Sequence, residues 1–496
     1  MGTGTPDVVI IGSGMGGASV AAGLAGAGAR VLMLERGRPI PADAHARDPR
    51  AVFVNGHFRP DETWLDAGGK TFVPGNHYNV GGNSKFYGAV LIRYRERDFE
   101  AVAEEDGISP AWPFPYAELA PWYDAAEKLY QVRGTADEDP TEPPHTGAYP
   151  FPPVVDEPAL AAVRARLERA GARPFSLPLG VDVDTWLAGG ATPWDGFPDT
   201  RSGKMDAETC GIAQALTDPD FTLLAGARVT RLETAPDGRT VAAVHYEREG
   251  EQARATPKLV VLAAGAVQSA ALLLASGLGN RSDQVGRNFM NHNASAIIAI
   301  DPRFLNDSVH QKTFGLNDWY WGDGEGGPPL GNVQLLGRVS GEILRGQVER
   351  VPGIVLDWIA RHAVDFYAIT EDLPRPDSRI TLEGNRIRLA WTRSNLHTHQ
   401  ALVARLKRLL RRAGFPIVLS RMFDGRTPSH QCGTVRIGTD GTEAPLDVFG
   451  RAFDHPNLFV ADASCLPTSA AVNPALTVAA LALRTADHIR RLELSA

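Results

Sequence analysis

Cysteine is scarce in this chain of 496 residues, which contains three: Cys210, Cys432 and Cys465. They lie far apart, are odd in number and form no CxxC spacing. Such cysteines support neither a disulfide framework nor a zinc site. We therefore expect a protein of a reducing compartment, the cytoplasm, with no metal site.

Positive charge is not in excess either. The chain has 50 Lys and Arg against 58 Asp and Glu, which gives a net charge of −8. Because nucleic-acid binding needs clustered positive charge to neutralise phosphates, we expect no nucleic-acid partner. The hydrophobic content of 43% and the charged content of 22% are typical of a folded globular protein.

Long hydrophobic runs are rare. The N-terminal sequence MGTGTPDVVII has no basic residue and its apolar run ends at once in glycines, unlike a signal peptide. Residues 258–279 are apolar enough to resemble a membrane span. Their β-branched first half, Gly265 and the polar Gln268 and Ser269 favour a strand, a turn and a helix instead, so we expect no membrane span.

Glycine, by contrast, is abundant, with 51 residues, and several of them follow a pattern. A strand-like run at residues 8–11 precedes GSGMGG, which has the GxGxxG spacing, and an Ala-rich helical pattern follows. A second strand pattern ends at Glu35, where a dinucleotide-binding unit carries an acidic residue for the ribose hydroxyls. The pattern predicts a dinucleotide site formed by Gly12, Ser13, Gly14, Met15, Gly16, Gly17, Glu35 and Arg36.

Further glycine turns favour one dinucleotide over another. They occur as VGGNS at residues 80–84 and AAGA at 263–266, and a further turn of small residues, VADAS at 460–464, contains no glycine. Several backbone approaches spread along a chain suit a long, extended cofactor in the interior, which favours FAD over NAD. We expect cofactor contacts at Gly81, Gly82, Asn83, Ser84, Ala263, Ala264, Gly265 and Asp462.

Taken together, these segments resemble the glucose-methanol-choline (GMC) oxidoreductase family. The resemblance rests on GSGMGG with Glu35, VGGNS, AAGAVQSAALLLASG, HQCGTVRIG and VADASCLPTSAAVNPALTVAALALR, which follow in this order from the first strand to the last helix. Within the family, HQCGT followed by NPALT is most similar to the pyranose-oxidase-like sugar and glycoside oxidases. The resemblance implies that Asp462 accepts hydrogen bonds from the ribityl chain of FAD and that the backbone at Val229 approaches the adenine.

The resemblance also implies that His430 and Asn473 face the flavin ring and the substrate. Oxidation of a secondary alcohol removes the hydroxyl proton while a hydride leaves carbon for flavin N5. The imidazole of His430, with an ordinary pKa of about 6.5, suits the base, and the amide of Asn473 can orient the hydroxyl. Asn473 is also expected to cap a helix that starts at Pro474, whose positive end, with Thr477, would face the flavin.

One position departs from the pyranose oxidases of fungi, which attach FAD covalently through a histidine after the second glycine turn. This chain reads GGNSKFYGAVL there, with Phe86 where that histidine would fall, and His77 lies further upstream. We therefore expect FAD to be held without a covalent bond. Its reoxidation is expected to use O2 or another redox acceptor.

The predicted fold is α/β, of the GMC type: a Rossmann-type FAD-binding domain interleaved with an α+β substrate domain that contains a mixed or antiparallel sheet. The expected parts are FAD-binding segments at 1–110, 201–300 and 431–496, a cap or substrate segment at 111–200 and a substrate-binding segment at 301–430. FTLLAGARVTRLETA, TVAAVHYERE and KLVVLAAG are expected to form a meander, and SRITLEGNRIRLAW a hairpin.

The leading functional hypothesis is an FAD-dependent oxidoreductase that acts on a secondary hydroxyl of a sugar or glycoside, a small polyhydroxylated substrate. An alternative is an enzyme of the same family that acts on a non-sugar alcohol such as a sterol or an amino alcohol. A third is a flavin-carrying protein that signals its redox state without turnover. The pair His430 and Asn473 counts against the third, because a carrier needs no base.

Overall fold

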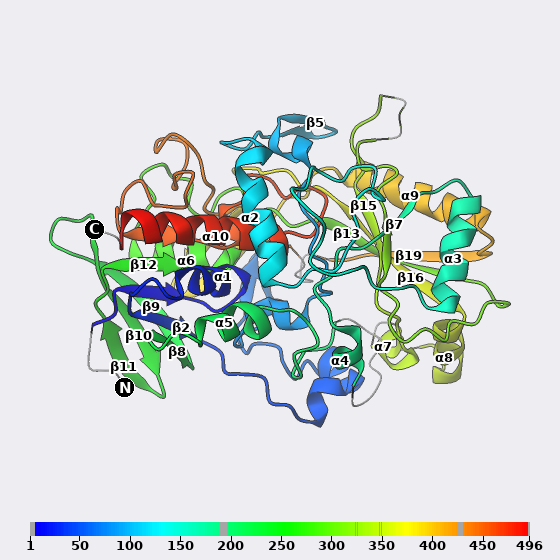
Figure 1. Cartoon of the computed structure of the whole chain (residues 1–496), viewed down its shortest axis with the longest axis horizontal. Coiled ribbons are helices and arrows are strands. Elements are labelled where there is room, and N and C mark those ends of the chain that lie inside the picture. Colours follow the sequence, from blue (N-terminus) through cyan, green and yellow to red (C-terminus); the bar gives the residue numbers. More distant parts are fainter. Residues whose placement is uncertain are drawn as a thin grey trace.

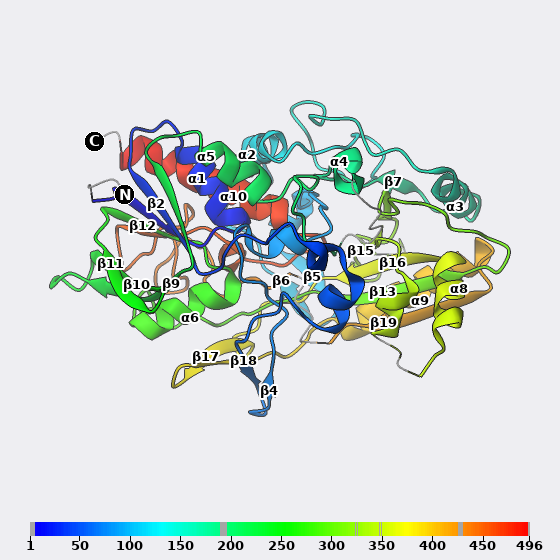
Figure 2. The same cartoon turned by 90° about the horizontal axis from the view of Figure 1, so that it is seen from below.

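Two large sheets, one parallel and one antiparallel, occupy opposite ends of an elongated molecule (Figures 1 and 2). The computed structural model describes residues 5–188, 196–322, 324, 326–346, 348, 350–424 and 430–494. The predicted fold class is confirmed in both parts. Within these residues no helix has the length and apolarity needed to cross a bilayer.

The parallel sheet has the strand order β20-β12-β1-β2-β8. Its strands are β1 (Val8–Ile11), β2 (Val31–Glu35), β8 (Phe221–Ala225), β12 (Leu259–Leu262) and β20 (Leu458–Val460). Helix α1 (Met15–Leu24) connects β1 to β2, as the GxGxxG pattern predicts. The first, middle and last parts of the chain therefore meet in one sheet.

Both faces of this sheet are covered, which explains why VVII and LVVL are continuous hydrophobic runs. Val8 and Ile10 face α1 and α10 (Ala475–Leu492) in one cluster. Val9 and Ile11 belong to the cluster on the other face, which contains residues of β9, β10 and α6 (Ala266–Ser276). The predicted strand, turn and helix of residues 258–279 are confirmed as β12 and α6.

The antiparallel meander differs in part from the prediction. Its three strands are β9 (Ala227–Thr234), β10 (Val241–Arg248) and β11 (Glu251–Ala255). The runs at Phe221 and Leu259, expected in the same meander, instead form β8 and β12 of the parallel sheet. The chain leaves the sheet at Gly226, forms the meander and returns.

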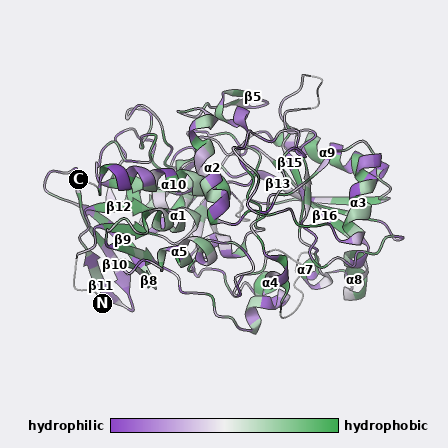
Figure 3. Cartoon of the chain, in the orientation of Figure 1, coloured by the Kyte–Doolittle hydropathy of each residue, from purple (hydrophilic) through white to green (hydrophobic). Residues whose placement is uncertain are grey.

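The second large sheet is antiparallel throughout, with the order β19-β13-β16-β15-β14-β7. Its strands are β7 (Pro174–Ser176), β13 (Asn293–Ile300), β14 (Phe314–Leu316), β15 (Asn332–Leu335), β16 (Ala363–Thr370) and β19 (Ile417–Met422). Helices α3 (Pro158–Arg169) and α9 (Leu396–Arg412) cover one face. Both helices carry hydrophilic and hydrophobic residues along their length (Figure 3).

Side-chain alternation along β15 gives this sheet a second, partly polar face. Val333 and Leu335 pack into the cluster under α3 and α9. Asn332 and Gln334 therefore point to the opposite face, where Ala294, Leu336 and Tyr367 form a small separate cluster.

Smaller elements complete the fold. The predicted hairpin is confirmed as β17 (Arg379–Glu383) and β18 (Arg386–Ala390), which join β3 (Trp64–Asp66) and β4 (Thr71–Phe72) in a mixed sheet. Strands β5 (Val102–Glu104) and β6 (Gly107–Ser109) pair with each other. The remaining α-helices of the described residues are α2 (Tyr116–Leu129), α4 (Val183–Leu187), α5 (Ala213–Ala215), α7 (Gly341–Arg345) and α8 (Gly353–Arg361).

Candidate functional site

The first glycine turn is held tightly against the ends of two neighbouring strands. Gly12 has φ +103°, and a Cβ at this position would lie 2.4 Å from the carbonyl oxygen of Ala263. A Cβ at Gly16 would lie 1.8 Å from the carbonyl oxygen of Ala461. Larger residues would push α1 away from the sheet, so the packing explains why these two positions are glycines.

Gly14 differs, because it faces open space. A Cβ at Gly14 would meet nothing within 4 Å, and Gly14 is the N-cap of α1 without a side-chain cap. A helix N-terminus with free N–H groups attracts an anion. The second glycine turn lies beside it, since a Cβ at Gly82 would be 3.3 Å from the Cα of Gly14 and Gly81 N donates to Ser13 Oγ at 3.1 Å.

Glu35 lies at the end of β2, next to this turn. One carboxylate oxygen accepts from the N–H and the hydroxyl of Ser13 at 3.0 and 2.7 Å, and the other accepts from Gly37 N at 2.7 Å. Burial raises the pKa of Glu35, and these hydrogen bonds act in the opposite direction. Glu35 thus holds the turn in shape, and its carboxylate retains lone pairs for a ribose hydroxyl.

The third turn is joined to the last strand through Asp462. Its carboxylate accepts from Gly265 N at 2.9 Å and from Ser269 Oγ at 2.5 Å, and its other oxygen accepts from the N–H and hydroxyl of Ser464. Gly265 caps α6 without a side-chain cap, and a Cβ there would meet nothing within 4 Å. Asp462 therefore positions a second open helix N-terminus; its contact to a ribityl chain stays a prediction.

Four other predicted cofactor residues already have partners within the protein. Ser84 Oγ donates to Gly81 O at 2.6 Å, and the side-chain oxygen of exposed Asn83 accepts from His77 N at 2.8 Å. Arg36 pairs with Glu62 at 3.0 Å, and the hydroxyl of Thr477 bonds that of Tyr123 at 2.8 Å. These contacts order the walls of the site.

Val229 lies in β9, where it pairs with Tyr246. Its predicted approach to adenine would use the backbone of the meander next to β2. Ala263 and Ala264 directly follow β12 and lie against Gly12. The two open helix N-termini, the adjoining glycine turns and the acidic end of β2 fit an elongated dinucleotide, so the residues present suit FAD.

The structure places a histidine beside Phe86. The rings of His77 and Phe86 are stacked, with centroids 3.7 Å apart and planes 12° from parallel. His77 Nδ1 lies 3.0 Å from the carbonyl oxygen of Phe58, so Nδ1 carries the proton. Burial lowers the pKa of His77 to about 3, which leaves Nε2 as a lone pair.

His430 and Asn473 meet as predicted, although they are far apart in sequence. Asn473 Nδ2 lies 3.2 Å from His430 Nε2, and both residues are half-buried. Burial, with electrostatic repulsion from Lys312 and from His292 whenever His292 is protonated, lowers the pKa of His430 well below its ordinary value. A neutral imidazole therefore faces the amide near neutral pH.

The cap predicted for the last helix is wrong in detail. Helix α10 begins at Ala475 with Pro474 at the N-cap position, and Val478 N donates to Pro474 O at 2.9 Å. Asn473 lies one residue before the cap and makes no side-chain cap. Its amide is engaged with other residues of the site instead, and the N-terminus of α10 lies in the middle of the molecule between the two large sheets (Figure 1).

His292 is a site residue that the sequence analysis missed. Its Nδ1 lies 2.7 Å from His430 Nδ1, and its Nε2 lies 2.9 Å from the carbonyl oxygen of Ser469. Burial lowers the pKa of His292 to about 4. The sequence NHN around His292 has no spacing that relates it to His430, so no motif could have signalled the pair.

Gln334 is a second residue that was missed. Its Nε2 donates to Asn473 Oδ1 at 2.9 Å and to Asn332 Oδ1 at 3.0 Å. Asn332 in turn donates to Asn317 at 2.8 Å, and Asn317 donates to Asp139 at 2.7 Å. The polar face of β15 thus fixes which end of the Asn473 amide points to His430. Only the alternation along GNVQLLG gave any signal that Gln334 faces away from the helices.

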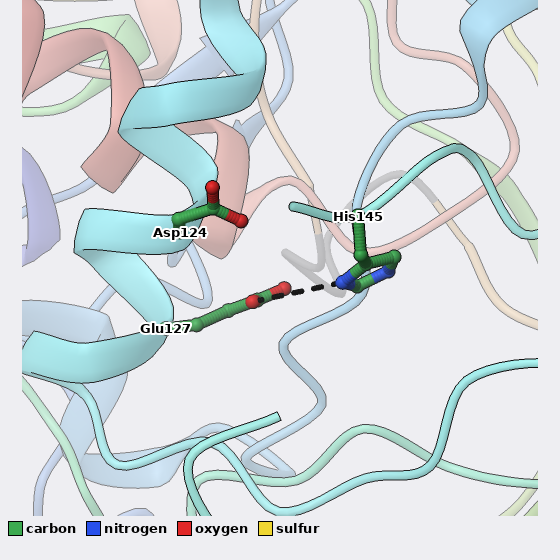
Figure 4. A group of neighbouring side chains, drawn as sticks. All are labelled: Asp124, Glu127 and His145. Carbon is green, nitrogen blue, oxygen red and sulfur yellow. Dashed lines mark ion pairs between the residues drawn. The ribbon is translucent and has the colours of Figure 1, made fainter. Parts of the chain in front are cut away.

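Among the described residues, one group has the composition of a metal site: Asp124, Glu127 and His145 (Figure 4). Arg93 Nη2 lies 2.6 Å from Asp124 and 2.7 Å from Glu127, and His145 Nε2 lies 2.6 Å from Glu142. The guanidinium therefore supplies the positive charge that these carboxylates need. The group joins α2 to the Pro-rich segment that follows it.

Two family models match two parts of the chain. Residues 7–309 match the family model FAD dependent oxidoreductase, and residues 374–482 match the GMC oxidoreductase model of the C-terminal domain. The second match contains His430 and Asn473. The first contains the glycine turns and Glu35.

Relatives and solved structures extend the likeness over the whole chain. The chain is 29% identical to 6'''-hydroxyparomomycin C oxidase of Streptomyces lividus and 28% identical to paromamine 6'-oxidase of Streptomyces fradiae; each alignment covers 97% of this chain and 91% of the relative. The crystal structure of pyridoxine 4-oxidase from Mesorbium loti superposes with a TM-score of 0.67 at 21% identity, over 97% of this chain and 99% of that one. The chain therefore belongs to the FAD-dependent oxidoreductases and carries the C-terminal domain of the GMC oxidoreductase family.

Proposed function

We propose that this FAD-dependent oxidoreductase oxidises a hydroxyl group of a sugar or glycoside, with His430 as the base and Asn473 as the residue that orients the hydroxyl. The observation that carries the proposal is the 3.2 Å approach of Asn473 Nδ2 to Nε2 of His430, a histidine whose pKa burial lowers well below its ordinary value. The names of the two relatives, oxidases of paromamine and of a paromomycin, support a substrate with sugar rings.

The roles follow from which atoms can donate and accept. His430 Nε2 accepts the hydroxyl proton, and general bases contribute about 10² to 10⁴ in rate. Asn473 Nδ2 donates to the hydroxyl oxygen and stabilises the negative charge that develops there. FAD, when bound, supplies the acceptor for the hydride that leaves carbon.

The N-terminus of α10 contributes electrostatically. A helix N-terminus carries the equivalent of about half a positive charge, and Pro474 caps it without a side chain that would occupy the free N–H groups. This end of the helix suits negative charge on the flavin. We further propose that the oxidised group is a secondary hydroxyl that becomes a ketone, and that O2 or another acceptor takes the electrons.

An anaerobic reduction assay tests the proposal. The flavin absorbance of the purified protein is expected to bleach with one or more sugars, glycosides or amino sugars, and His430→Ala is expected to slow bleaching by about 10² to 10⁴. Analysis of the product distinguishes a ketone from an aldehyde, and admission of air tests O2 as the acceptor.

A matched control is His455→Ala, which removes a buried histidine that bonds Gly279 N at 3.0 Å and Arg239 O at 2.7 Å, away from His430. It should bleach at the wild-type rate. Bleaching only by sterols or amino alcohols would overturn the substrate class, and bleaching of His430→Ala at the wild-type rate would overturn the base.

A further inference from the structure

The contact between His292 and His430 is set by strand register. Met290 and Cys432 form an antiparallel bridge, with Met290 N bonded to Cys432 O at 3.0 Å and Cys432 N bonded to Met290 O at 2.9 Å. His292 lies two residues after Met290, and His430 lies two residues before Cys432. In an antiparallel pair these two residues are therefore cross-strand neighbours on the same face. Asn291 holds this register, because its side-chain oxygen accepts from His430 N at 2.9 Å.

Hydrogen-bond chemistry then determines the proton positions in the pair. The carbonyl oxygen of Ser469 can only accept, so His292 Nε2 must carry a proton. In a neutral His292 the Nδ1 atom is then a lone pair, and His430 Nδ1, 2.7 Å away, must donate to it. A neutral His430 consequently has its lone pair on Nε2, the atom that faces Asn473.

The hydrogen bonds of Asn473 agree with this assignment. Gln334 Nε2 can only donate, so the atom of Asn473 that it contacts at 2.9 Å is the amide oxygen. The Asn473 amide nitrogen therefore points to His430 and needs an acceptor there. Without substrate, the lone pair on His430 Nε2 satisfies it, and the substrate hydroxyl would take over that lone pair; the other tautomer would set two donors against each other.

We propose that His292 is a positioning residue that holds His430 in the Nδ1–H tautomer and so keeps Nε2 available as the base; for its effect on rate, the inference rests on the proposed function. His292 touches neither substrate nor cofactor in this role. If His292 were itself protonated at Nδ1, it would donate to His430 Nδ1 and move the proton of His430 to Nε2. Among the described residues, charged groups near the pair include Lys312 and the carboxylate of Asp372, which accepts from Asn291 N at 3.1 Å.

Two substitutions of His292 test whether its hydrogen-bond acceptor, and not the bulk of its ring, determines the tautomer of His430. In His292→Asn the amide oxygen can stand close to the position of Nδ1 and accept from His430, whereas His292→Leu fills the space without an acceptor. We expect His292→Leu to lower the rate of flavin reduction at saturating substrate by about 10²-fold with little change in KM, because the wrong tautomer dominates. His292→Asn should recover most of that loss.

The tautomer of His430 can be measured without substrate, which tests the role of His292 separately from the proposed function. In FAD-loaded protein labelled with ¹⁵N-histidine, the His430 signals are identified by their loss in His430→Gln. We expect a protonated Nδ1 and an unprotonated Nε2 in wild type and in His292→Asn, and a change of tautomer in His292→Leu. His455→Leu, which removes another buried histidine with two hydrogen bonds, should leave the His430 signals unchanged.

The outcomes are decisive in either direction. A wild-type His430 with its proton on Nε2, or a His292→Leu variant with wild-type tautomer and rate, overturns the role of His292. If the tautomer changes as expected but no sugar bleaches the flavin, the proposed substrate class fails and the role of His292 stands.

Discussion

The half-buried imidazole of His77 lies beside Phe86, the residue that stands where the fungal pyranose oxidases have their FAD-attaching histidine. His77 stacks on Phe86, donates from Nδ1 to a backbone carbonyl and has an unprotonated Nε2. Sequence distance from the glycine turn suggested that His77 was remote, but the loop folds back and brings the two rings together. The residue therefore provides a direct test of how FAD is held.

We expect FAD to dissociate from the protein on precipitation with acid, because Phe86 occupies the place of the attaching histidine. The measurement is flavin absorbance in the supernatant and in the washed pellet. His77→Ala should show the same distribution as wild type. Flavin that stays with the wild-type pellet and is released in His77→Ala would reverse the expectation and assign the bond to His77.

Single residues were predictable where a motif or a resemblance named them. The structure brings the glycines of GSGMGG next to Glu35 and His430 next to Asn473, while the roles of these residues stay predictions. His292 and Gln334 were not predictable, because their positions depend on the register of two segments and on which face of β15 points to the site. Neither quantity leaves a signal within one segment of sequence.

At the scale of elements, the turn between β1 and α1 combines two different demands. Gly16 is required by the packing of α1 against Ala461, whereas Gly14 is surrounded by open space and has φ −69°, which any residue can adopt. The backbone at Gly14 is therefore available for a ligand rather than for packing.

Gly14→Ala is expected to leave the melting temperature of the FAD-free protein nearly unchanged and to weaken FAD binding about tenfold or more, because a methyl group would stand where the pyrophosphate approaches. Calorimetry of FAD binding and thermal unfolding of the apoprotein measure the two effects. Gly16→Ala is the matched comparison, since its Cβ would clash with Ala461 O and lower the melting temperature. Unaltered FAD affinity in Gly14→Ala would contradict the predicted cradle.

Most elements were predictable because their periodicity is strong, as in β1, α1, the β17–β18 hairpin and α9. The errors concern how elements pair. The run at Phe221 is a good strand in either a meander or a parallel sheet, and only its pairing with β2 decides between them. Likewise, NP before an apolar run indicates a helix start, but the tertiary bonds of Asn473 to Gln334 and His430 replaced the expected cap. The division of the chain into domains stays a prediction. Strands β13 and β7 come from two expected segments other than 301–430, yet they pair with strands of that segment in one sheet.

At the scale of the whole molecule, three buried or half-buried acids gather where several distant segments meet. Asp98, Glu104 and Glu371 line one cavity together with Tyr320 and Ala471. Burial, with the negative charges of its neighbours, raises the pKa of Glu104 to about 8, and burial raises the pKa of Glu371 as well. The cluster retains protons that the unfolded chain would release.

The raised pKa of Glu104 makes the stability of the folded protein depend on pH. Between the ordinary pKa of Glu104, 4.5, and its folded value of about 8, the folded state binds more protons than the unfolded state, so this group makes stability fall as pH rises. Glu104→Gln removes that loss and should raise the melting temperature by roughly 1–3 °C at pH 8, with little effect at pH 5. Exposed Glu100→Gln should change neither. An equal shift of Glu104→Gln at both pH values would be inconsistent with the retained proton.

The proposed catalytic residues and their hydrogen-bond partners come from both halves of the molecule. Asn473 precedes the helix packed on the parallel sheet, while Gln334 comes from the antiparallel sheet and His292 from the residue before its strand β13. The FAD cradle, by contrast, uses mainly the strand ends and helix starts of the parallel sheet. We therefore expect catalysis to require the completely folded chain. A folding intermediate in which only the parallel half had formed would bind FAD but would be inactive. Its His430 would not be held in the required tautomer, and the amide of Asn473 would not be oriented.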